Sequence, residues 1–450
     1  MSALQKRVLQ SGLPPRPPMS IGRGGLSAGR KKRDYSAVHW SKYFHNKLYV
    51  KLDNGDSFCV YEGGTKSTTD ITIPVLVFLH GGGFSALTWA HLNSHLSRSV
   101  ECRVFALDLR GHGDTTINAS LDKKNGELDL RAEKLSDDIS QVVSKLLGET
   151  TPPVVLVGHS MGGALAVHTA LLGCTNNEDV PPDTLETRHS LDHPGIRNLV
   201  GICVIDVVEG TAMDALSSMQ SFLRSRPKSF PSIDYAIEWA VRSGQVRNLD
   251  SARVSMPGQL KNMDTGVCST QDVNAEAVEL DTNIQEHMKI VQKNQASVDS
   301  IAEEAEEDDM SHSSTDEHQL CSSEKSLAYE KFKKLENENE IPSKKSSSYT
   351  WRVDLCKSEP HWTGWFSGLS SKFLSISASK LLVLAGVDRL DRDLTVGQMQ
   401  GKFQMQILPQ AGHAIHEDVP DKVADILATF LVRNKFAKPL SDFQKTFPAC

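Results

Sequence analysis

Long hydrophobic runs are missing from this chain of 450 residues. No apolar stretch reaches the length of about 20 residues that a membrane-spanning helix needs. The N-terminal region also lacks the continuous apolar segment that secretory signals contain. We therefore expect a soluble protein of the cytoplasm, the nucleus or both, with no membrane partner.

An excess of positive charge is missing too, because the formal net charge is −7. An acidic chain gives no general electrostatic reason to bind nucleic acid, so no nucleic-acid partner is expected. A basic run, Arg30-Lys31-Lys32-Arg33, ends a segment rich in Pro, Gly, Ser and Arg. We predict a disordered leader over residues 1–35, with the run serving as a nuclear address or as a solvated basic tail.

Cys-x-x-Cys pairs are absent, although the chain contains eight cysteines. Several of them, such as Cys102 and Cys203, stand in apolar runs typical of buried, reduced thiols in intracellular proteins. The sequence also contains no phosphate-binding loop and no complete set of metal ligands. We therefore predict neither disulfides nor a zinc site, and no cofactor.

Aromatic residues are absent from Lys261 to Ala328, and this stretch includes the acidic run Glu303–Asp309. A segment so polar cannot bury a core of its own, so we predict a disordered insertion over about residues 261–348. The rest of the chain, from residue 36 to 450, is expected to form one domain that the insertion interrupts.

What is present is an alternation of apolar strand-like runs and amphipathic helices that follows an initial hairpin. This order is typical of an α/β fold with a mostly parallel central sheet wrapped by helices. A helical cap is expected at about residues 211–256. The expected strands are 47–52, 58–61, 74–79, 102–107, 154–157, 199–204, 380–384 and 403–408, and the main helices outside the cap are 86–98, 130–147 and 419–432.

The most informative stretch is Val154–Ala170, in which a buried-strand run is followed by Gly158-His159-Ser160-Met161-Gly162 and a helical pattern. A strand, a Gly-x-Ser-x-Gly turn and a helix are typical of the nucleophile elbow of serine α/β-hydrolases. The small residues leave room for a tight turn that raises the hydroxyl of Ser160 above the sheet. A serine nucleophile predicts acyl transfer, such as ester, thioester or amide hydrolysis.

The base and the acid of a triad should follow Ser160 in the order acid, then histidine. His413 stands between the last strand and the last helix, where the base is expected, and His416 is the weaker candidate. For the acid, Asp388 follows the seventh strand and Asp206 follows the sixth. The pattern of residues alone leaves both open.

Two further glycines are candidates for an oxyanion hole. His80-Gly81-Gly82-Gly83 follows the third strand, and its backbone N–H groups at Gly82 and Gly83 are expected to act with that of Met161. The stretch Asp108–Gly113 at the next strand end is expected to tie neighbouring loops together, without a catalytic role.

Several longer stretches resemble the protein phosphatase methylesterase family. They are residues 79–89, 106–115, 157–170, 205–216, 237–256, 382–406 and 408–424. The resemblance implies a serine carboxylesterase that removes the methyl ester from the C-terminal leucine of the protein phosphatase 2A catalytic subunit, which would be both substrate and partner. It also implies a triad of Ser160, Asp206 and His413, with Asp388 as the second choice.

Docking on a folded protein substrate requires a surface as well as a pocket. The cap helices and the aromatic residues of 362–366 are candidates, although these aromatics are equally expected to pack the fold. Val298, Ile301 and Glu303 resemble a linear motif that B-prime-type regulatory subunits of the phosphatase recognise. The alternative functions are a general small-ester carboxylesterase and a phosphatase-binding inhibitor that depends little on hydrolysis.

Overall fold

The computed structural model describes residues 33–66, 70–118, 128–172, 195–278, 348–386 and 390–447. The chain divides into one unit of residues 1–273 and 348–450 and a second of residues 274–347. Arg30, Lys31, Lys32, the predicted motif at 298–303 and the candidate acid Asp388 lie outside the described residues.

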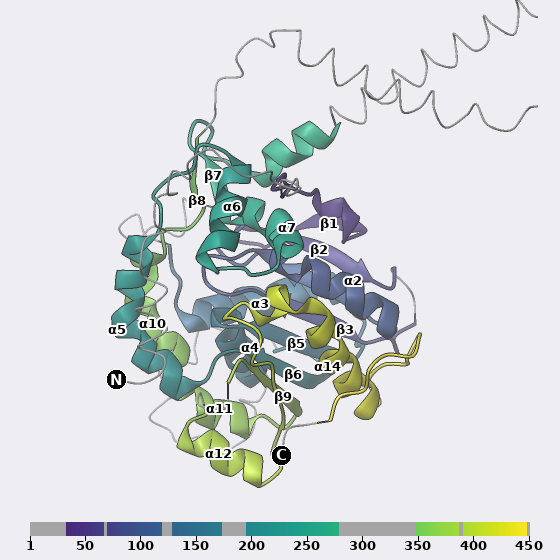
Figure 1. The fold of residues 1–450 in the computed structure, drawn as a ribbon. Helices are drawn as coiled ribbons and strands as arrows, with labels where there is room; N and C mark the ends of the chain where they lie inside the picture. Colours follow the sequence, from purple (N-terminus) through teal and green to yellow (C-terminus); the bar gives the residue numbers. More distant parts are fainter. Residues whose placement is uncertain are drawn as a thin grey trace, which may run out of the picture. The chain divides into compact units, whose positions relative to one another are not determined.

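A central sheet organises the first unit (Figure 1). In the described part of the chain its strand order is β1-β2-β4-β3-β5-β6-β9-β10. Strand β2 is antiparallel to both of its neighbours, β1 and β4, and the strands from β4 to β10 are parallel. The predicted α/β class with a mostly parallel sheet is confirmed. The strands are β1 (Asn46–Lys51), β2 (Ser57–Gly64), β3 (Val75–Leu79), β4 (Arg103–Leu107), β5 (Val154–His159), β6 (Leu199–Ile205), β9 (Ser379–Leu384) and β10 (Gln404–Ile407).

Helices cover both faces of this sheet, and each face has its own hydrophobic cluster. Helices α2 and α14 pack together on one face, whereas α3, α4, α10 and α11 contribute to the cluster on the other. The helices are α2 (Ala90–Ser99), α3 (Ala132–Leu147), α4 (Met161–Leu172), α10 (Glu359–Phe366), α11 (Leu369–Ser375), α12 (Arg392–Met399), α13 (Ile415–Asp418) and α14 (Pro420–Arg433), with 3-10 turns η1 (Trp40–Lys42), η2 (Ala86–Trp89) and η4 (Leu355–Ser358).

The segment after β6 is helical, in the place where the cap is predicted. It contains α5 (Glu209–Ser225), α6 (Ile233–Ser243) and α7 (Leu249–Gln259). Helices α6 and α7 share a third hydrophobic cluster with Phe230 and Tyr349, whereas α5 has no fully buried residue and lies beside α10 (Figure 1).

The predicted start of the insertion at Lys261 is wrong, because the chain from there to Val273 is part of the packed unit. Strand β7 (Leu260–Asn262) pairs with β8 (Tyr349–Trp351), Cys268 is buried, and the hydroxyl of Thr270 donates to Asp114. The overall polarity of the window 261–328 hides this short stretch, whose order depends on contacts distant in sequence. Residues 279–347 lie outside the described part.

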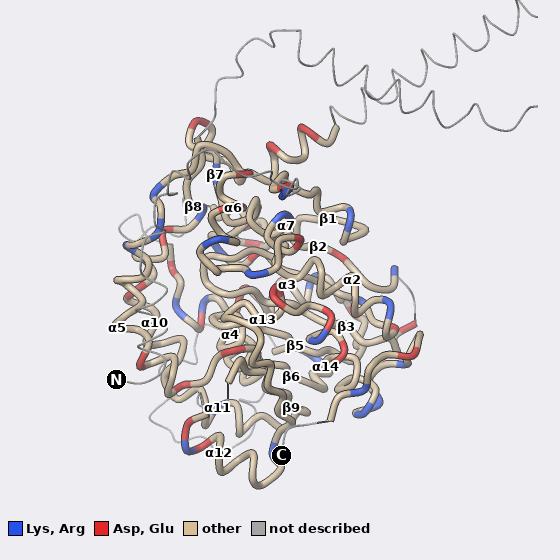
Figure 2. The backbone as a smooth tube through the Cα atoms, in the orientation of Figure 1, with Lys and Arg blue, Asp and Glu red and all other residues tan. Residues whose placement is uncertain are grey.

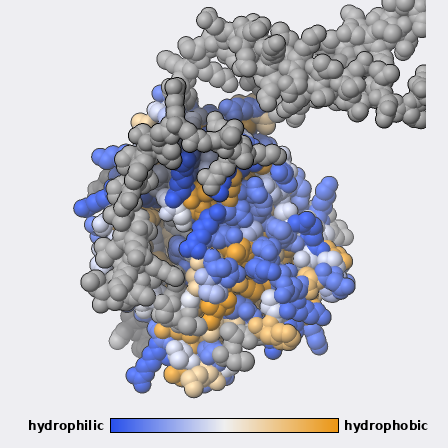
Figure 3. Space-filling model, in the orientation of Figure 1, coloured by the Kyte–Doolittle hydropathy of each residue, from blue (hydrophilic) through white to orange (hydrophobic). Residues whose placement is uncertain are grey.

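The aromatic residues of α10 are not a docking surface. Trp362, Trp365 and Phe366 are only 3–5% exposed, and the Trp365 indole N–H donates to the Leu130 carbonyl. Exposed apolar side chains are found elsewhere: Figure 3 shows hydrophobic residues at the bottom of the view, over α12, where Val396 and Met399 are exposed.

Charged residues of both signs are distributed around the described backbone (Figure 2). Within the described residues, no helix combines the length and the apolar character that crossing a bilayer requires. Cys59, Cys102, Cys203 and Cys268 are buried, as the apolar runs around Cys102 and Cys203 predict for those two residues.

Candidate active site

Ser160 occupies a strained turn between β5 and α4. Its φ of 52° lies in the left-handed region, which costs about 1–3 kcal/mol for a residue other than glycine. The turn is possible only with glycine on either side. A Cβ on Gly158 would lie 2.1 Å from the Gly162 carbonyl oxygen, and a Cβ on Gly162 would lie 2.2 Å from the Leu79 carbonyl oxygen. This is the geometry that the Gly-x-Ser-x-Gly pattern predicts.

Asp206 stands at the equivalent point of the neighbouring strand, since His159 of β5 is paired with Ile205 of β6. Its φ is also positive, at 54°, and the residue is buried. The Ala385 N–H donates to its Oδ1 at 3.1 Å, and His413 Nδ1 donates to its Oδ2 at 2.8 Å. A carboxylate on Nδ1 fixes the imidazole tautomer and leaves Nε2 as an acceptor.

The structure therefore brings Asp206 and His413 together and places Ser160 at the adjacent strand end. The His413 side chain is 53% exposed, so its outer nitrogen can meet a substrate. In the described part of the chain, no hydrogen bond links Ser160 to His413. Such contacts are commonly loose in structures without substrate and tighten when it binds.

His159 supports the loop that carries His413. Its ring is fully buried between those of His413 and His416, with centroids 4.7 and 4.5 Å away, and its Nε2 donates to the His413 carbonyl at 2.9 Å. Burial holds the pKa of His159 well below its usual value, so the ring is neutral. The prediction that His159 is packed and hydrogen-bonded is confirmed.

The segment that follows His413 contributes to a buried polar cluster of Thr88, Ser255, His416 and Glu417. The sequence pattern does not predict this cluster. Thr88 contacts both His416 and Glu417, and the Ser255 hydroxyl donates to Glu417 Oε2 at 2.6 Å. Burial raises the pKa of Glu417 to about 8, in spite of these hydrogen bonds. The sequence signal is weak, because His416 and Glu417 look like surface residues at the start of a helix.

The three predicted oxyanion residues also lie close together. A Cβ on Gly82 would be 3.7 Å from Met161 Sδ, and Gly83 has a φ of 77° that favours glycine. In this structure the Gly83 N–H donates to His112 Nε2 at 3.0 Å, so that amide already has an acceptor. The side chain of Leu355 covers the loop, since a Cβ on Gly83 would lie 2.8 Å from Leu355 Cδ1.

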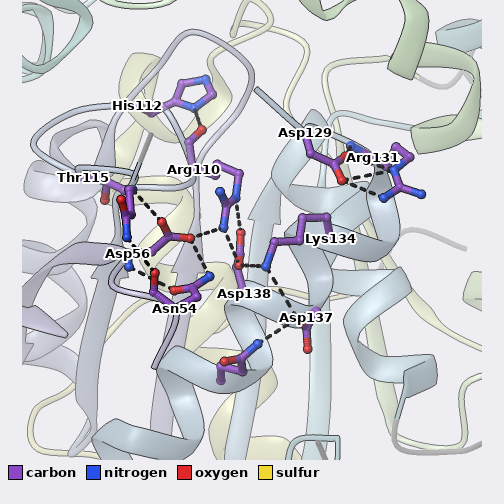
Figure 4. Close-up of polar contacts among 12 residues, drawn as sticks. Asn54, Asp56, Arg110, His112, Thr115, Asp129, Arg131, Lys134, Asp137 and Asp138 are labelled. Atoms are coloured by element: carbon purple, nitrogen blue, oxygen red, sulfur yellow. Dashed lines mark hydrogen bonds and ion pairs between the residues drawn. The ribbon is translucent and has the colours of Figure 1, made fainter. Parts of the chain in front are cut away.

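The loop after β4 has the supporting role that the sequence predicts. Asp108 accepts hydrogen bonds from the backbone of Ala86 and Asp114, which ties this loop to the chain beyond the glycines. Arg110 is fully buried and forms ion pairs with Asp56 and Asp138, both at 2.5 Å (Figure 4). These contacts hold the loop in the position in which His112 accepts the hydrogen bond of the Gly83 N–H.

Cys59, Asp108 and Asp114 are close enough to suggest a metal site, because their ligand atoms lie within 4.8 Å of one another. Their hydrogen bonds argue against one. Asp114 Oδ2 already accepts from Lys47 at 2.8 Å and from the Thr270 hydroxyl at 2.7 Å, and burial raises the pKa of the Cys59 thiol. A neutral thiol and saturated carboxylates are poor metal ligands.

Comparisons with known proteins agree with this geometry. The profile of the Alpha/beta hydrolase family matches residues 76–318. A mouse protein named "Protein phosphatase methylesterase 1" is 46% identical over 460 aligned positions, which cover 100% of both chains. The chain belongs to the protein phosphatase methylesterase family.

More distant relatives extend the same assignment. A Caenorhabditis elegans protein named "Probable protein phosphatase methylesterase 1" is 36% identical and covers 97% of this chain and 86% of its own. Among solved structures, E-2-(acetamidomethylene)succinate hydrolase superposes with a TM-score of 0.50 at 14% identity, over 86% of this chain and 100% of that one. The chain is therefore an α/β-hydrolase enzyme, and the resemblance read from its sequence is confirmed.

Proposed function

We propose that this protein is a serine carboxylesterase that removes the methyl ester from the C-terminal leucine of the protein phosphatase 2A catalytic subunit. The observation that carries the proposal is the hydrogen bond between His413 and Asp206, beside the strained turn at Ser160. It occurs in a chain that is 46% identical over its full length to mouse and human proteins named "Protein phosphatase methylesterase 1".

In the proposed mechanism, His413 takes the proton of the Ser160 hydroxyl as the oxygen attacks the ester carbonyl. Asp206 holds the imidazole in the reactive tautomer and stabilises the imidazolium that forms. The tetrahedral intermediate then collapses, His413 protonates the leaving oxygen, and methanol departs. Water, activated by the same histidine, hydrolyses the acyl-enzyme and releases the free carboxylate.

Backbone N–H groups at Gly82, Gly83 and Met161 are proposed to stabilise the oxyanion. Each well-placed donor of this type contributes about 3 kcal/mol to transition-state stabilisation. Because the Gly83 N–H donates to His112 in this structure, its use in catalysis requires exchange of one acceptor for another. Gly82 and Met161 then supply the donors that need no such exchange.

Two partner proteins are proposed. The catalytic subunit of the phosphatase is the substrate and partner, and a regulatory subunit is proposed to bind Val298, Ile301 and Glu303. Absence of binding between that subunit and a peptide of residues 293–310 would remove the second partner without affecting the first.

The test is demethylation of methylated phosphatase 2A catalytic subunit by the wild type and four variants. Ser160→Ala supplies the blank, Asp206→Asn and Asp388→Asn compare the two candidate acids, and Asp393→Asn on the exposed start of α12 is the matched surface control. We expect Asp206→Asn to lose about 10³-fold or more in kcat, and the control to keep full activity.

Each alternative gives a different pattern. Loss of activity in Asp388→Asn together with survival of Asp206→Asn would reassign the acid. A wild type that cleaves many simple esters but not the methylated subunit would indicate a general carboxylesterase. Full suppression of the phosphatase by Ser160→Ala would favour the inhibitor.

A further inference from the structure

Arg226, directly after α5, is a cation that no carboxylate of the described residues pairs with. Its guanidinium carbon lies 3.4 Å from the centroid of the Trp351 ring. Its Nε is buried and has no hydrogen-bond partner, and its Nη2 reaches Gln245 Oε1 only at a long 3.4 Å. Among the described residues, no carboxylate lies within ion-pair distance of it, and burial lowers its pKa to about 10.

This unpaired cation belongs to a chain of polar groups that is incomplete at several points. Gln245 donates to Gln259 Oε1 at 3.0 Å, but Gln259 Nε2 is buried and has no partner. Gly258, the preceding residue, packs so tightly on Ser85 that an added Cβ would meet Ser85 Oγ at 2.1 Å. That hydroxyl is buried and has no partner either.

The groups run from Ser85, near the glycine loop of the site, through the backbone at Gly258 to Gln259, and from there by hydrogen bonds through Gln245 to Arg226 on Trp351. Ser85 is two residues beyond Gly83, one of the proposed oxyanion residues. A second connection runs along the backbone, because Leu355, four residues after Trp351, lies against Gly83. The backbone from Trp351 to Leu355 spans at most about 14 Å, which is the length of about four residues of an extended peptide.

The charge and burial of the Arg226 guanidinium indicate which chemical group it would bind. A partly desolvated guanidinium without a counter-ion is unfavourable, and a carboxylate is the group that matches its planar set of donors. Both Arg226 and Trp351 remain partly exposed, so a ligand can approach them from solvent. A flat indole beneath the guanidinium fixes its plane and therefore favours one direction of approach.

We propose that Arg226 on Trp351 forms a subsite for an acidic side chain of the substrate peptide, located a few residues before the C-terminal methyl ester. The inference rests on the proposed function, because it assumes a peptide ester at Ser160. It adds a specificity element: the enzyme selects a C-terminal segment that carries a negative charge at this distance from the ester.

The test uses pairs of short peptide methyl esters that differ only by Glu or Gln at one position, moved stepwise away from the ester. The kcat/KM ratio of each pair is measured for the wild type, Arg226→Met, Arg226→Lys and Arg224→Met. Arg224→Met is the matched control, because Arg224 is an exposed arginine in the last turn of α5, two residues before Arg226. Unfolding curves establish that each variant is folded.

We expect the wild type to prefer the Glu peptide at one position by roughly 10-fold, mainly through KM, and to lose this preference at high salt. Arg226→Met should bring the ratio to about one, Arg226→Lys should retain part of it, and Arg224→Met should not change it.

Two results would overturn the inference, and they are distinguishable from failure of the proposed function. A wild-type ratio of one at every position, or an unchanged ratio in folded Arg226→Met, removes the subsite while leaving methyl ester hydrolysis intact. A wild type that hydrolyses neither the peptide esters nor the methylated phosphatase subunit removes the function, and the subsite with it.

Discussion

Glu417 makes the stability of this enzyme depend on pH in a direction opposite to that of most carboxylates. It is fully buried four residues after His413, and burial raises its pKa from 4.5 to about 8. Between these values the folded protein holds a proton that the unfolded chain has released. The unfolded state therefore binds fewer protons, and the free energy of unfolding falls as the pH rises.

The size of the effect follows from the shift. A difference of about 3.5 pH units, at about 1.4 kcal/mol for each unit, corresponds to about 5 kcal/mol when the pH passes from below 4.5 to above 8. Glu417→Gln removes the ionisation while keeping the shape of the protonated acid. Thr88 and Ser255, which contact the carboxyl group, offer hydroxyl oxygens that an amide can use.

The assay is denaturant unfolding of the wild type and Glu417→Gln from about pH 5 to pH 9. We expect the variant to gain several kcal/mol relative to the wild type over this range, with most of the gain accumulating below pH 8. Glu133→Gln, an exposed change on α3, should show no such gain. A constant difference between wild type and Glu417→Gln across the range would show that Glu417 is ionised in the folded protein, and would refute the reasoning.

Three further predictions concern the elements around the site. His159→Phe should lower methyl ester hydrolysis about 10²-fold and His159→Gln should recover most of it, because Gln can still donate to the His413 carbonyl; equal losses would assign His159 to packing alone. Gly162→Ala should destabilise the fold by more than about 3 kcal/mol in denaturant unfolding, since its Cβ would meet a backbone oxygen, and a near-wild-type midpoint would contradict this. Arg110→Met should cost about 3–5 kcal/mol in the same assay, because buried Asp56 loses the cation that pairs with it and Asp138 keeps only Lys134, and a loss below about 1 kcal/mol would show that the Arg110 ion pairs contribute little to stability.

The central strands β3, β4, β5 and β6 could be predicted because they are short, mostly apolar runs with glycine or aspartate at or just after their ends. Val75–Leu79 is buried at every position, and the observed strand lies within one residue of the predicted one. The ordered segment at 261–273 could not be predicted in this way. Its strand β7 is three residues long, and its partner β8 begins at Tyr349, on the far side of the predicted insertion.

The choice between the two candidate acids shows a second limit of prediction from the sequence. Asp206 and Asp388 both follow parallel strands, so their local patterns are equivalent. Strand order separates them: β6 lies directly beside β5, whereas β9 is one strand further from Ser160. Only the pairing of strands distant in sequence places Asp206 next to the elbow, and only the resemblance to a family could favour it in advance.

The position of His413, the proposed catalytic base, depends on buried polar contacts of residues that the sequence pattern places on the surface. The segment from Gly412 to Asp418 is short and polar, as an exposed loop would be. In the structure, Asp418 accepts the Gly412 N–H at 2.6 Å and the Arg247 N–H at 2.7 Å, while Glu417 is buried behind the loop. A charged residue at the start of an amphipathic helix normally faces solvent. Here Asp418 instead holds the loop in place through its hydrogen bonds. The histidine therefore depends on hydrogen bonds to the cap segment and to β5, which no local pattern encodes.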